Sequence, residues 1–348
     1  MSSNVRQVLP RILTVALIAC SAAPRIHAQQ DCPRILEQDP ELNNLVDPPG
    51  SPTAPLGSLG GVLRAGTGSQ AMILIPGLGF SAEIFTDFMR EFAGDYRMFA
   101  VTLPGFGGTA PPPAPAESVS FGEQPWTNGA LAGIEKLIAE EKLERPIIVG
   151  HWLTGTQLAL RLALRHPDQI KAVVLLSGSA RMTANNPAQA AQLATLEQRV
   201  AITDRYMAPR WFKTVTRETW DDNNFLPGDY AVNPVRGLRL WRAAAAPKLH
   251  VWVRYLCEFN AQDVGLELSA LTVPTLLLQP GLEGLEFDPS NNYMESFCLK
   301  SWEGCIENLA PFQVKTISHA RACPWFDQPT AVKQAMTEFL KSADGGQR

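Results

Sequence analysis

Residues 147–167 read IIVGHWLTGTQLALRLALRHP, and this stretch decides the fold. An apolar run stops at Gly150, and a leucine-rich segment follows, with Leu158 and Leu162 among its apolar residues. This pattern predicts a strand, a sharp turn and a helix. Trp152 stands at the tip of the predicted turn.

The same alternation of strand and helix continues on both sides of this segment. Parallel sheets covered by helices on both faces have this rhythm, so we expect an α/β fold with a mostly parallel central sheet. The predicted strands are AMILIPG (71–77), YRMFAVTLPG (96–105), IKAVVLLSG (170–178), VPTLLLQP (273–280) and FQVKTIS (312–318); the predicted helices are SAEIFTDFMREFAG (81–94), residues 125–144 and TAVKQAMTEFLKSA (330–343).

One long segment interrupts the alternation of strands and helices. Residues 180–262 are helical in character, rich in Ala, Arg and Trp, and lie between two predicted strands. An insertion at this point lies over the carboxyl ends of the strands, where open α/β sheets form their pockets. We interpret it as a helical cap that divides the core into residues 67–179 and 263–348. Residues 29–66 are rich in Pro, Gly, Asp and Asn, which predicts an irregular N-terminal arm.

The first 28 residues have the pattern of a signal peptide. Arg6 and Arg11 precede an apolar run, and small residues lead to a cleavage site after Ala28. We therefore expect an exported protein, periplasmic or extracellular. An alternative stays open, because residues 17–20 resemble a bacterial lipobox, which would make Cys20 a lipid anchor.

Composition excludes several classes of protein. The chain is 45% hydrophobic and 18% charged, which suits a globular domain. Its net charge of -4 does not suggest a nucleic-acid partner, which usually faces a clustered basic surface. The run of residues 12–19 is too short for a permanent span, and we expect no integral membrane segment in the mature chain.

Export also decides how the cysteines are interpreted, because oxidising compartments favour disulfides over metal sites. Five cysteines follow Cys20, an odd number, so at least one is unpaired. We predict a bond between Cys298 and Cys305, which are close in sequence, whereas the partner of Cys32 stays open. No spacing matches a zinc site, and we expect neither a metal nor a cofactor.

Five phrases of this sequence, in order, resemble the α/β-hydrolase superfamily, specifically its capped branch of esterases and haloalkane dehalogenase-like proteins. Together they cover nearly all of residues 69–342. The resemblance implies the α/β-hydrolase fold with a cap and a hydrolytic centre. The phrases are LIPGLGFS (74–81), LPGFGGT (103–109), VGHWLTG (149–155), ALRHPDQIKAVVLLS (163–177) and CPWFDQP (323–329).

In that superfamily a nucleophile at the tip of the elbow, a histidine and an acid form the catalytic triad. The resemblance puts Trp152 at the nucleophile position, between the small residues Gly150 and Thr154, and Ala322 at the histidine position. An indole is neither a nucleophile nor a general base. No catalytic residue therefore stands at the two positions that need one.

Three residues are candidates for the remaining parts of such a centre, the acid and the two oxyanion donors. Glu283 is a residual acid, and the backbone N–H groups of Leu78 and Leu153 are candidate oxyanion donors, because their side-chain identity does not matter. We interpret the chain as a degenerate member, a pseudoenzyme that binds a small apolar or aromatic molecule. Its candidate ligand-binding residues are Trp152, Phe80 and His151.

Alternatives stay open for the function and for single residues. A displaced catalytic set, such as Cys323 with His319, would make the protein an esterase-like hydrolase, and an oxyanion site with one base would make it a lyase. A third possibility is an interaction protein with a plugged pocket. Trp152 itself is either a platform for a ligand or an apolar plug, and His151 is mainly expected to pack.

Overall fold

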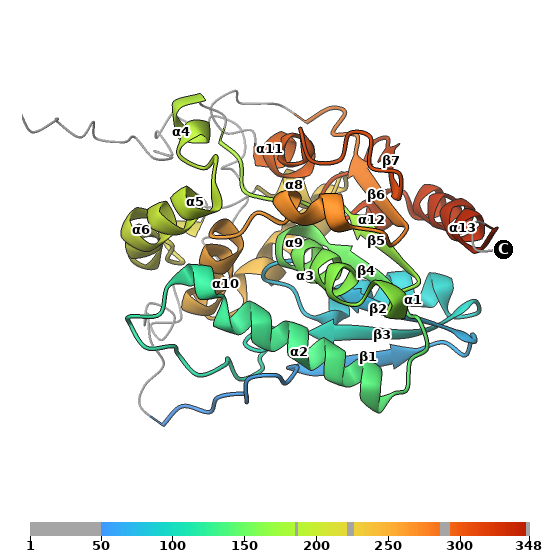
Figure 1. Ribbon diagram of the computed structural model, residues 1–348, viewed down its shortest axis with the longest axis horizontal. Coiled ribbons are helices and arrows are strands. Elements are labelled where there is room, and N and C mark those ends of the chain that lie inside the picture. Colours follow the sequence, from blue (N-terminus) through green and yellow to red (C-terminus); the bar gives the residue numbers. More distant parts are fainter. Residues whose placement is uncertain (1–49, 185–186, 221–225, 286–292, 346–348) are drawn as a thin grey trace, which may run out of the picture. The chain divides into compact units, whose positions relative to one another are not determined.

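The computed structural model describes residues 50–184, 187–220, 226–285 and 293–345, which all belong to one compact unit of residues 34–348 (Figure 1). The predicted signal peptide, Cys20, Cys32 and most of the predicted arm lie outside the described residues. Export and lipid anchoring therefore stay predictions.

A seven-stranded sheet forms the centre of this unit, in the order β1-β3-β2-β4-β5-β6-β7. Only the pairing of β1 with β3 is antiparallel, which confirms the mostly parallel α/β sheet. The strands are β1 (Gly61–Ala65), β2 (Gln70–Ile75), β3 (Tyr96–Thr102), β4 (Ile147–His151), β5 (Ala172–Leu176), β6 (Thr275–Pro280) and β7 (Phe312–Ile317).

The prediction of an irregular arm over residues 29–66 is wrong at its end, where β1 forms. Gly61 pairs with Thr102, and the ladder runs to the pairing of Ala65 with Met98. This short strand has little β propensity of its own. Its main chain becomes a strand because β3 offers an unpaired edge.

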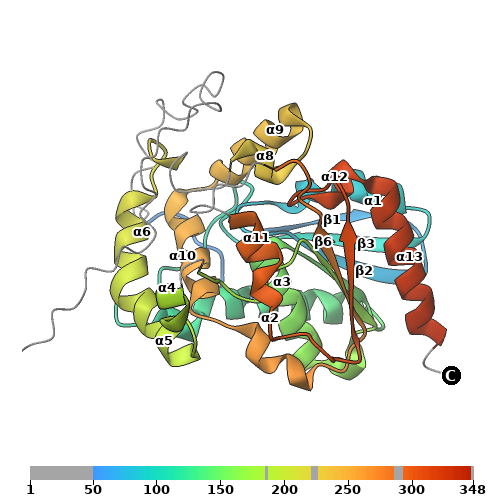
Figure 2. The same cartoon turned by 90° about the horizontal axis from the view of Figure 1, so that it is seen from above.

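Helices cover both faces of the sheet: α2 and α3 lie on one face, α1 and α13 on the other (Figure 2). The central strands β4 and β5 are buried at every residue, as strands between two helical layers must be. The α-helices outside the insertion are α1 (Thr86–Phe92), preceded by the short η2 (Ala82–Phe85), α2 (Pro125–Glu140), α3 (Trp152–Arg165), α11 (Tyr293–Cys298), α12 (Pro324–Asp327) and α13 (Pro329–Gly345), among the described residues.

A helical insertion separates β5 from β6, as the cap prediction requires. An isolated antiparallel bridge joins Arg181 near its start to Asp263 near its end. The Asp263 carboxylate is buried and pairs with Arg181 at 3.4 Å and with Arg199 at 3.3 Å, so both ends of the insertion are held to one of its own helices. The insertion contains α4 (Pro187–Ala191), α5 (Leu196–Ile202), the π-helix η5 (Thr203–Met207), α6 (Ala208–Thr214), α8 (Pro227–Tyr230), α9 (Pro234–Ala245) and α10 (Leu249–Asn260).

Candidate functional site

The elbow between β4 and α3 has a strained backbone at its tip. Trp152 has a φ of 54°, in the left-handed region that bulky residues rarely adopt. A β-carbon on Gly150 would lie 2.5 Å from the carbonyl oxygen of Gly155, and one on Gly155 would lie 2.5 Å from that of Ile75. Both positions therefore require glycine. Gly155, one residue beyond the predicted small residue Thr154, makes the second close approach, and the role of Thr154 stays a prediction.

The Trp152 side chain is packed against neighbouring residues and is almost inaccessible to solvent. It is 2% exposed and stacks on Tyr230 of α8, with ring centres 6.4 Å apart and planes at 30°. Tyr230 also meets Phe80 edge to face at 5.9 Å. Of the two interpretations of Trp152, this geometry favours the plug, since a ligand reaches the indole only if Tyr230 moves.

His151, just before the tip, is fully buried, and both of its ring nitrogens are in use. The backbone N–H of Gly77 donates to Nδ1 at 3.2 Å, so Nε2 carries the proton and donates to the carbonyl oxygen of Ala322 at 3.1 Å. Burial lowers the pKa of His151 to about 3, although the bond to Ala322 opposes this. His151 is therefore a neutral structural link and has no free lone pair with which to act as a base.

The loop that carries the predicted histidine position is attached to the cap through its main chain. Ala322 is 1% exposed, and its N–H donates to the carbonyl oxygen of Asp229 at 3.0 Å. The N–H of Cys323 donates to the carbonyl oxygen of Tyr230 at 3.3 Å. Two main-chain hydrogen bonds thus hold this loop to α8.

Asp327 adds a second link between the same two segments. One carboxylate oxygen accepts from the N–H of Val232 at 2.9 Å and the other from the N–H of Arg321 at 3.0 Å. Partial burial raises the pKa of Asp327, even though these bonds and the nearby arginines act in the opposite direction.

The displaced pair of Cys323 with His319 is not brought together among the described residues. The Cys323 thiol is buried, which raises its pKa well above the usual value, and its Sγ lies 3.8 Å from Nε2 of His151. His319 lies in an exposed turn after β7, where its backbone N–H donates to the Glu283 carboxylate at 2.6 Å. The predicted pair is wrong because the turn directs the two residues to different environments.

Glu283, the candidate residual acid, follows β6 and lies beside the loop that precedes Ala322. Its pKa is lowered, chiefly because its carboxylate accepts hydrogen bonds from its own backbone N–H and from that of His319. The carboxylate is therefore ionised and close to the expected place, but Ala322 offers no imidazole for it to orient.

The two candidate oxyanion residues are buried, Leu78 at 2% and Leu153 at 1% exposure. Leu153 lies in the first turn of α3, whose N–H groups have no partner within the helix. Both residues stay candidates for that role.

Sequence reasoning missed two aromatic residues that complete this region. Tyr230 lies in a stretch that the sequence marks only as a turn, and no local signal places it on Trp152. Trp325 meets the edge of His151 at 4.8 Å and stacks on Phe85 at 5.4 Å. Its place close after Ala322, in the CPWFDQP phrase, was the available signal.

The predicted disulfide between Cys298 and Cys305 is not formed, and both thiols are free. Cys298 is fully buried with its Sγ directed at the carbonyl oxygen of Ser177, whereas Cys305 lies near carbonyl oxygens of its own loop. Within the described ranges there is no cluster of three His, Cys, Asp or Glu side chains that could hold a metal. No helix of those ranges is long and apolar enough to cross a membrane.

The comparison with protein families matches residues 72–335 to the model of the alpha/beta hydrolase family. Among curated proteins, a pimeloyl-[acyl-carrier protein] methyl ester esterase from Edwardsiella ictaluri is 26% identical over 119 residues, which is 34% of this chain. The matched segment spans only 40% of that esterase.

Solved structures resemble the chain over most of its length. A bromoperoxidase from Bacillus anthracis has a TM-score of 0.55 at 17% identity, covering 80% of this chain and 94% of that one. An esterase from Thermogutta terrifontis has a TM-score of 0.53 at 19% identity, covering 81% and 93%. At these identities the likeness concerns the fold alone.

Proposed function

This chain belongs to the alpha/beta hydrolase family, and we propose that it is a non-hydrolytic member that binds a small apolar or aromatic molecule without turning it over. The observation that carries the proposal is Trp152, which keeps the backbone of a nucleophile but has no atom for covalent catalysis. Its indole fills the space beside the elbow together with Tyr230.

The absence of a usable base supports the proposal independently. Ala322 stands at the histidine position, and the nearest imidazole, His151, donates its only proton to Ala322 and accepts from Gly77. In a Ser-His-acid triad the imidazole needs a free lone pair to take the proton of the nucleophile. His151 as hydrogen-bonded here has none.

A hydrolase that uses Cys323 is the alternative, and the contact with His151 is the observation that favours it. Three facts weigh against it: the thiol is fully buried, its pKa is raised, and Nε2 already carries a proton. A thiol with a raised pKa supplies little thiolate, which is the reactive form.

The test is hydrolysis of a panel of short activated esters by four proteins: wild type, Cys323→Ala, Trp152→Ser and the double variant Trp152→Ser/Ala322→His. We expect the wild type and Cys323→Ala to equal the rate without protein. We expect the double variant to gain activity over Trp152→Ser, because it supplies a base as well as a nucleophile. Wild-type activity that Cys323→Ala abolishes would overturn the proposal.

Binding at the elbow itself requires motion, because Trp152, Phe80 and His151 are at most 3% exposed. We propose that a ligand of that region displaces Tyr230 from Trp152. A Tyr230→Ala variant should then raise affinity for small aromatic probes in a thermal-shift screen, with Tyr206→Ala, an exposed residue of η5, as its matched control. Equal responses of the two variants would argue against a site beside Trp152.

The proposal also includes export, to the periplasm or the outside of the cell. It rests on the pattern of residues 1–28, with lipid anchoring at Cys20 as its alternative. Mass spectrometry of the processed protein distinguishes the two, because cleavage after Ala28 leaves Gln29 at the terminus and lipidation leaves a modified Cys20.

A further inference from the structure

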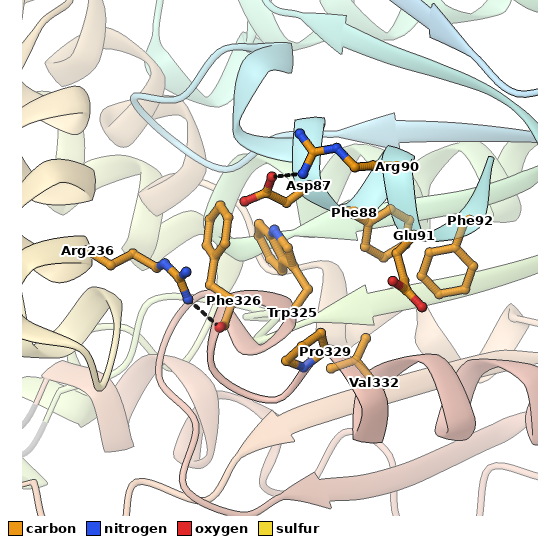
Figure 3. Close-up of a pocket in the computed structure, with 10 residues that line it drawn as sticks. All are labelled: Asp87, Phe88, Arg90, Glu91, Phe92, Arg236, Trp325, Phe326, Pro329 and Val332. Atoms are coloured by element: carbon orange, nitrogen blue, oxygen red, sulfur yellow. Dashed lines mark hydrogen bonds and ion pairs between the residues drawn. The ribbon is translucent and has the colours of Figure 1, made fainter.

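A pocket of about 210 Å³ opens between α1, α9, α12 and α13 (Figure 3). Its apolar lining contains four aromatic rings, those of Phe88, Phe92, Trp325 and Phe326. Trp325 forms the wall between this pocket and His151, so the pocket is distinct from the elbow. Its volume is below the usual range for drug-sized ligands, which limits an occupant to one or two rings.

Trp325 offers a polar atom that the protein leaves unused. The residue is 4% exposed, and its indole Nε1 has no hydrogen-bond partner in the described part of the chain. Figure 3 draws the nitrogen edge of the indole on the side of Asp87. A buried N–H without an acceptor is unfavourable, and an acceptor oxygen of a ligand would remove that cost.

The ion pair over this edge can open at little cost. Asp87 and Arg90 are in contact at 2.8 Å, and their side chains are 53% and 73% exposed. Exposed pairs of this kind contribute little to stability, since water screens them and side-chain entropy opposes them. Because the Trp325 N–H is buried, a ligand has to displace a neighbouring side chain to reach it, and the exposed Asp87 is the candidate on that side in Figure 3.

One cation of the lining, Arg236, makes no direct ion pair with a described acid; its guanidinium lies over the Phe326 ring at 5.2 Å and donates to the Phe326 carbonyl oxygen. Its charge also acts on the partly buried Asp327, whose oxygens already accept from the N–H groups of Val232 and Arg321. The two acids of the lining have partners of their own, Asp87 in Arg90 and Glu91 in Lys333. Arg236 is therefore the cation of the lining with which a carboxylate can pair directly.

We propose that this pocket binds a small aromatic carboxylate of one or two rings. The ring packs among the four aromatic side chains, the Trp325 N–H donates to an acceptor oxygen, and Arg236 supplies the charge that prefers a carboxylate. The site does not depend on whether the elbow is hydrolytic, because it lies on the other side of Trp325.

The test is titration of the full chain with 1-naphthoate and with its neutral analogue 1-naphthamide, followed by calorimetry. We expect saturable binding of 1-naphthoate with a dissociation constant of about 1 mM or below, the order that a ligand of this size reaches. The carboxylate should bind at least about threefold tighter than the amide, and Arg236→Gln should abolish that preference. The control is Arg64→Gln, another exposed arginine, which should leave both affinities unchanged.

Trp325→Phe keeps a ring but removes the donor, and should weaken both ligands about threefold to tenfold. A second measurement does not depend on that variant's stability: the indole N–H resonance of Trp325 should shift when 1-naphthoate is added to the ¹⁵N-labelled wild type. Absence of saturable binding, an unshifted resonance, or equal affinity for the acid and the amide would overturn the proposal.

Discussion

The elbow and the loop after β7 meet at His151, and they differ in what constrains them. The elbow is fixed by steric contacts of its backbone, at Gly150 and Gly155, where a single added carbon has no room. The loop is held by main-chain hydrogen bonds to α8 that do not involve the side chain at position 322, and by the Asp327 carboxylate.

This difference separates what each region demands of its residues. The elbow requires glycine at positions 150 and 155, because an added β-carbon would meet a carbonyl oxygen at 2.5 Å in either place. The main-chain bonds of the loop place no such demand on the residue type at position 322.

The largest effect should come from breaking the steric constraint of the elbow. Gly155→Ala places a β-carbon 2.5 Å from the Ile75 carbonyl oxygen, between two core elements that cannot yield easily. We expect the free energy of unfolding to fall by about 3 kcal/mol, measured by urea denaturation. Gly94→Ala is the control, because its β-carbon meets nothing within 4 Å. A loss below about 1 kcal/mol at Gly155 would contradict the steric account of the elbow.

The pH dependence of the free energy of unfolding tests whether a neutral His151 connects the two regions. Its pKa is 6.5 when exposed and about 3 in the folded protein, so the unfolded chain binds the proton first as pH falls. The stabilisation is fully present above pH 6.5 and is lost as pH falls towards 3, with a slope of up to about 1.4 kcal/mol per pH unit.

The measurement is urea denaturation of wild type and His151→Gln between pH 8 and pH 4. Glutamine can accept from Gly77 and donate to Ala322 but does not titrate. The variant should therefore lose less stability than wild type over this range, with the values at pH 8 correcting for altered packing. Parallel pH profiles would show that His151 is not held neutral.

The fold was predictable because its signals are local and repeated. Apolar runs such as Ile147–Val149 and Ala172–Leu176 mark buried strands, and Gly150 marks the elbow without any knowledge of its surroundings. β1 was missed because its pairing with β3 is tertiary. The places of Trp152 and Ala322 at the nucleophile and histidine positions are what the resemblance implies, and they stay predictions.

The contacts that surround Trp152 and Ala322 could not be predicted from the sequence. Tyr230 comes from a turn far along the chain, and only the folded cap brings its ring onto Trp152. The role of His151 depends on two partners, Gly77 and Ala322, that lie on different loops. Contacts between distant loops leave no periodic pattern in a sequence.

We expect a smaller loss of stability when the hydrogen bonds between the loop after β7 and the cap are weakened. In Asp327→Asn the amide can accept from only one of the two N–H groups, of Val232 and Arg321, that the carboxylate now serves. We expect a loss of about 1 kcal/mol in urea denaturation. Glu338→Gln, an exposed site on α13, is the matched control. An unchanged stability in Asp327→Asn would mean that the link between cap and loop is not needed to hold that region.

The smallest effect concerns the predicted Cys298–Cys305 bond, which would join two residues of the segment that precedes β7. With both thiols free, the partly exposed Cys305 should react with a thiol reagent in the folded protein, although its raised pKa slows the reaction. The buried Cys257, Cys298 and Cys323 should react only after unfolding.

Peptide mapping without reductant assigns the labelled residues, and Cys305→Ser should remove the early label with little change in stability. A linked Cys298–Cys305 peptide would restore the disulfide prediction. Such a bond would add a covalent link within the segment before β7. It would leave the contrast between the two regions unchanged, because neither cysteine belongs to the elbow or to the loop after β7.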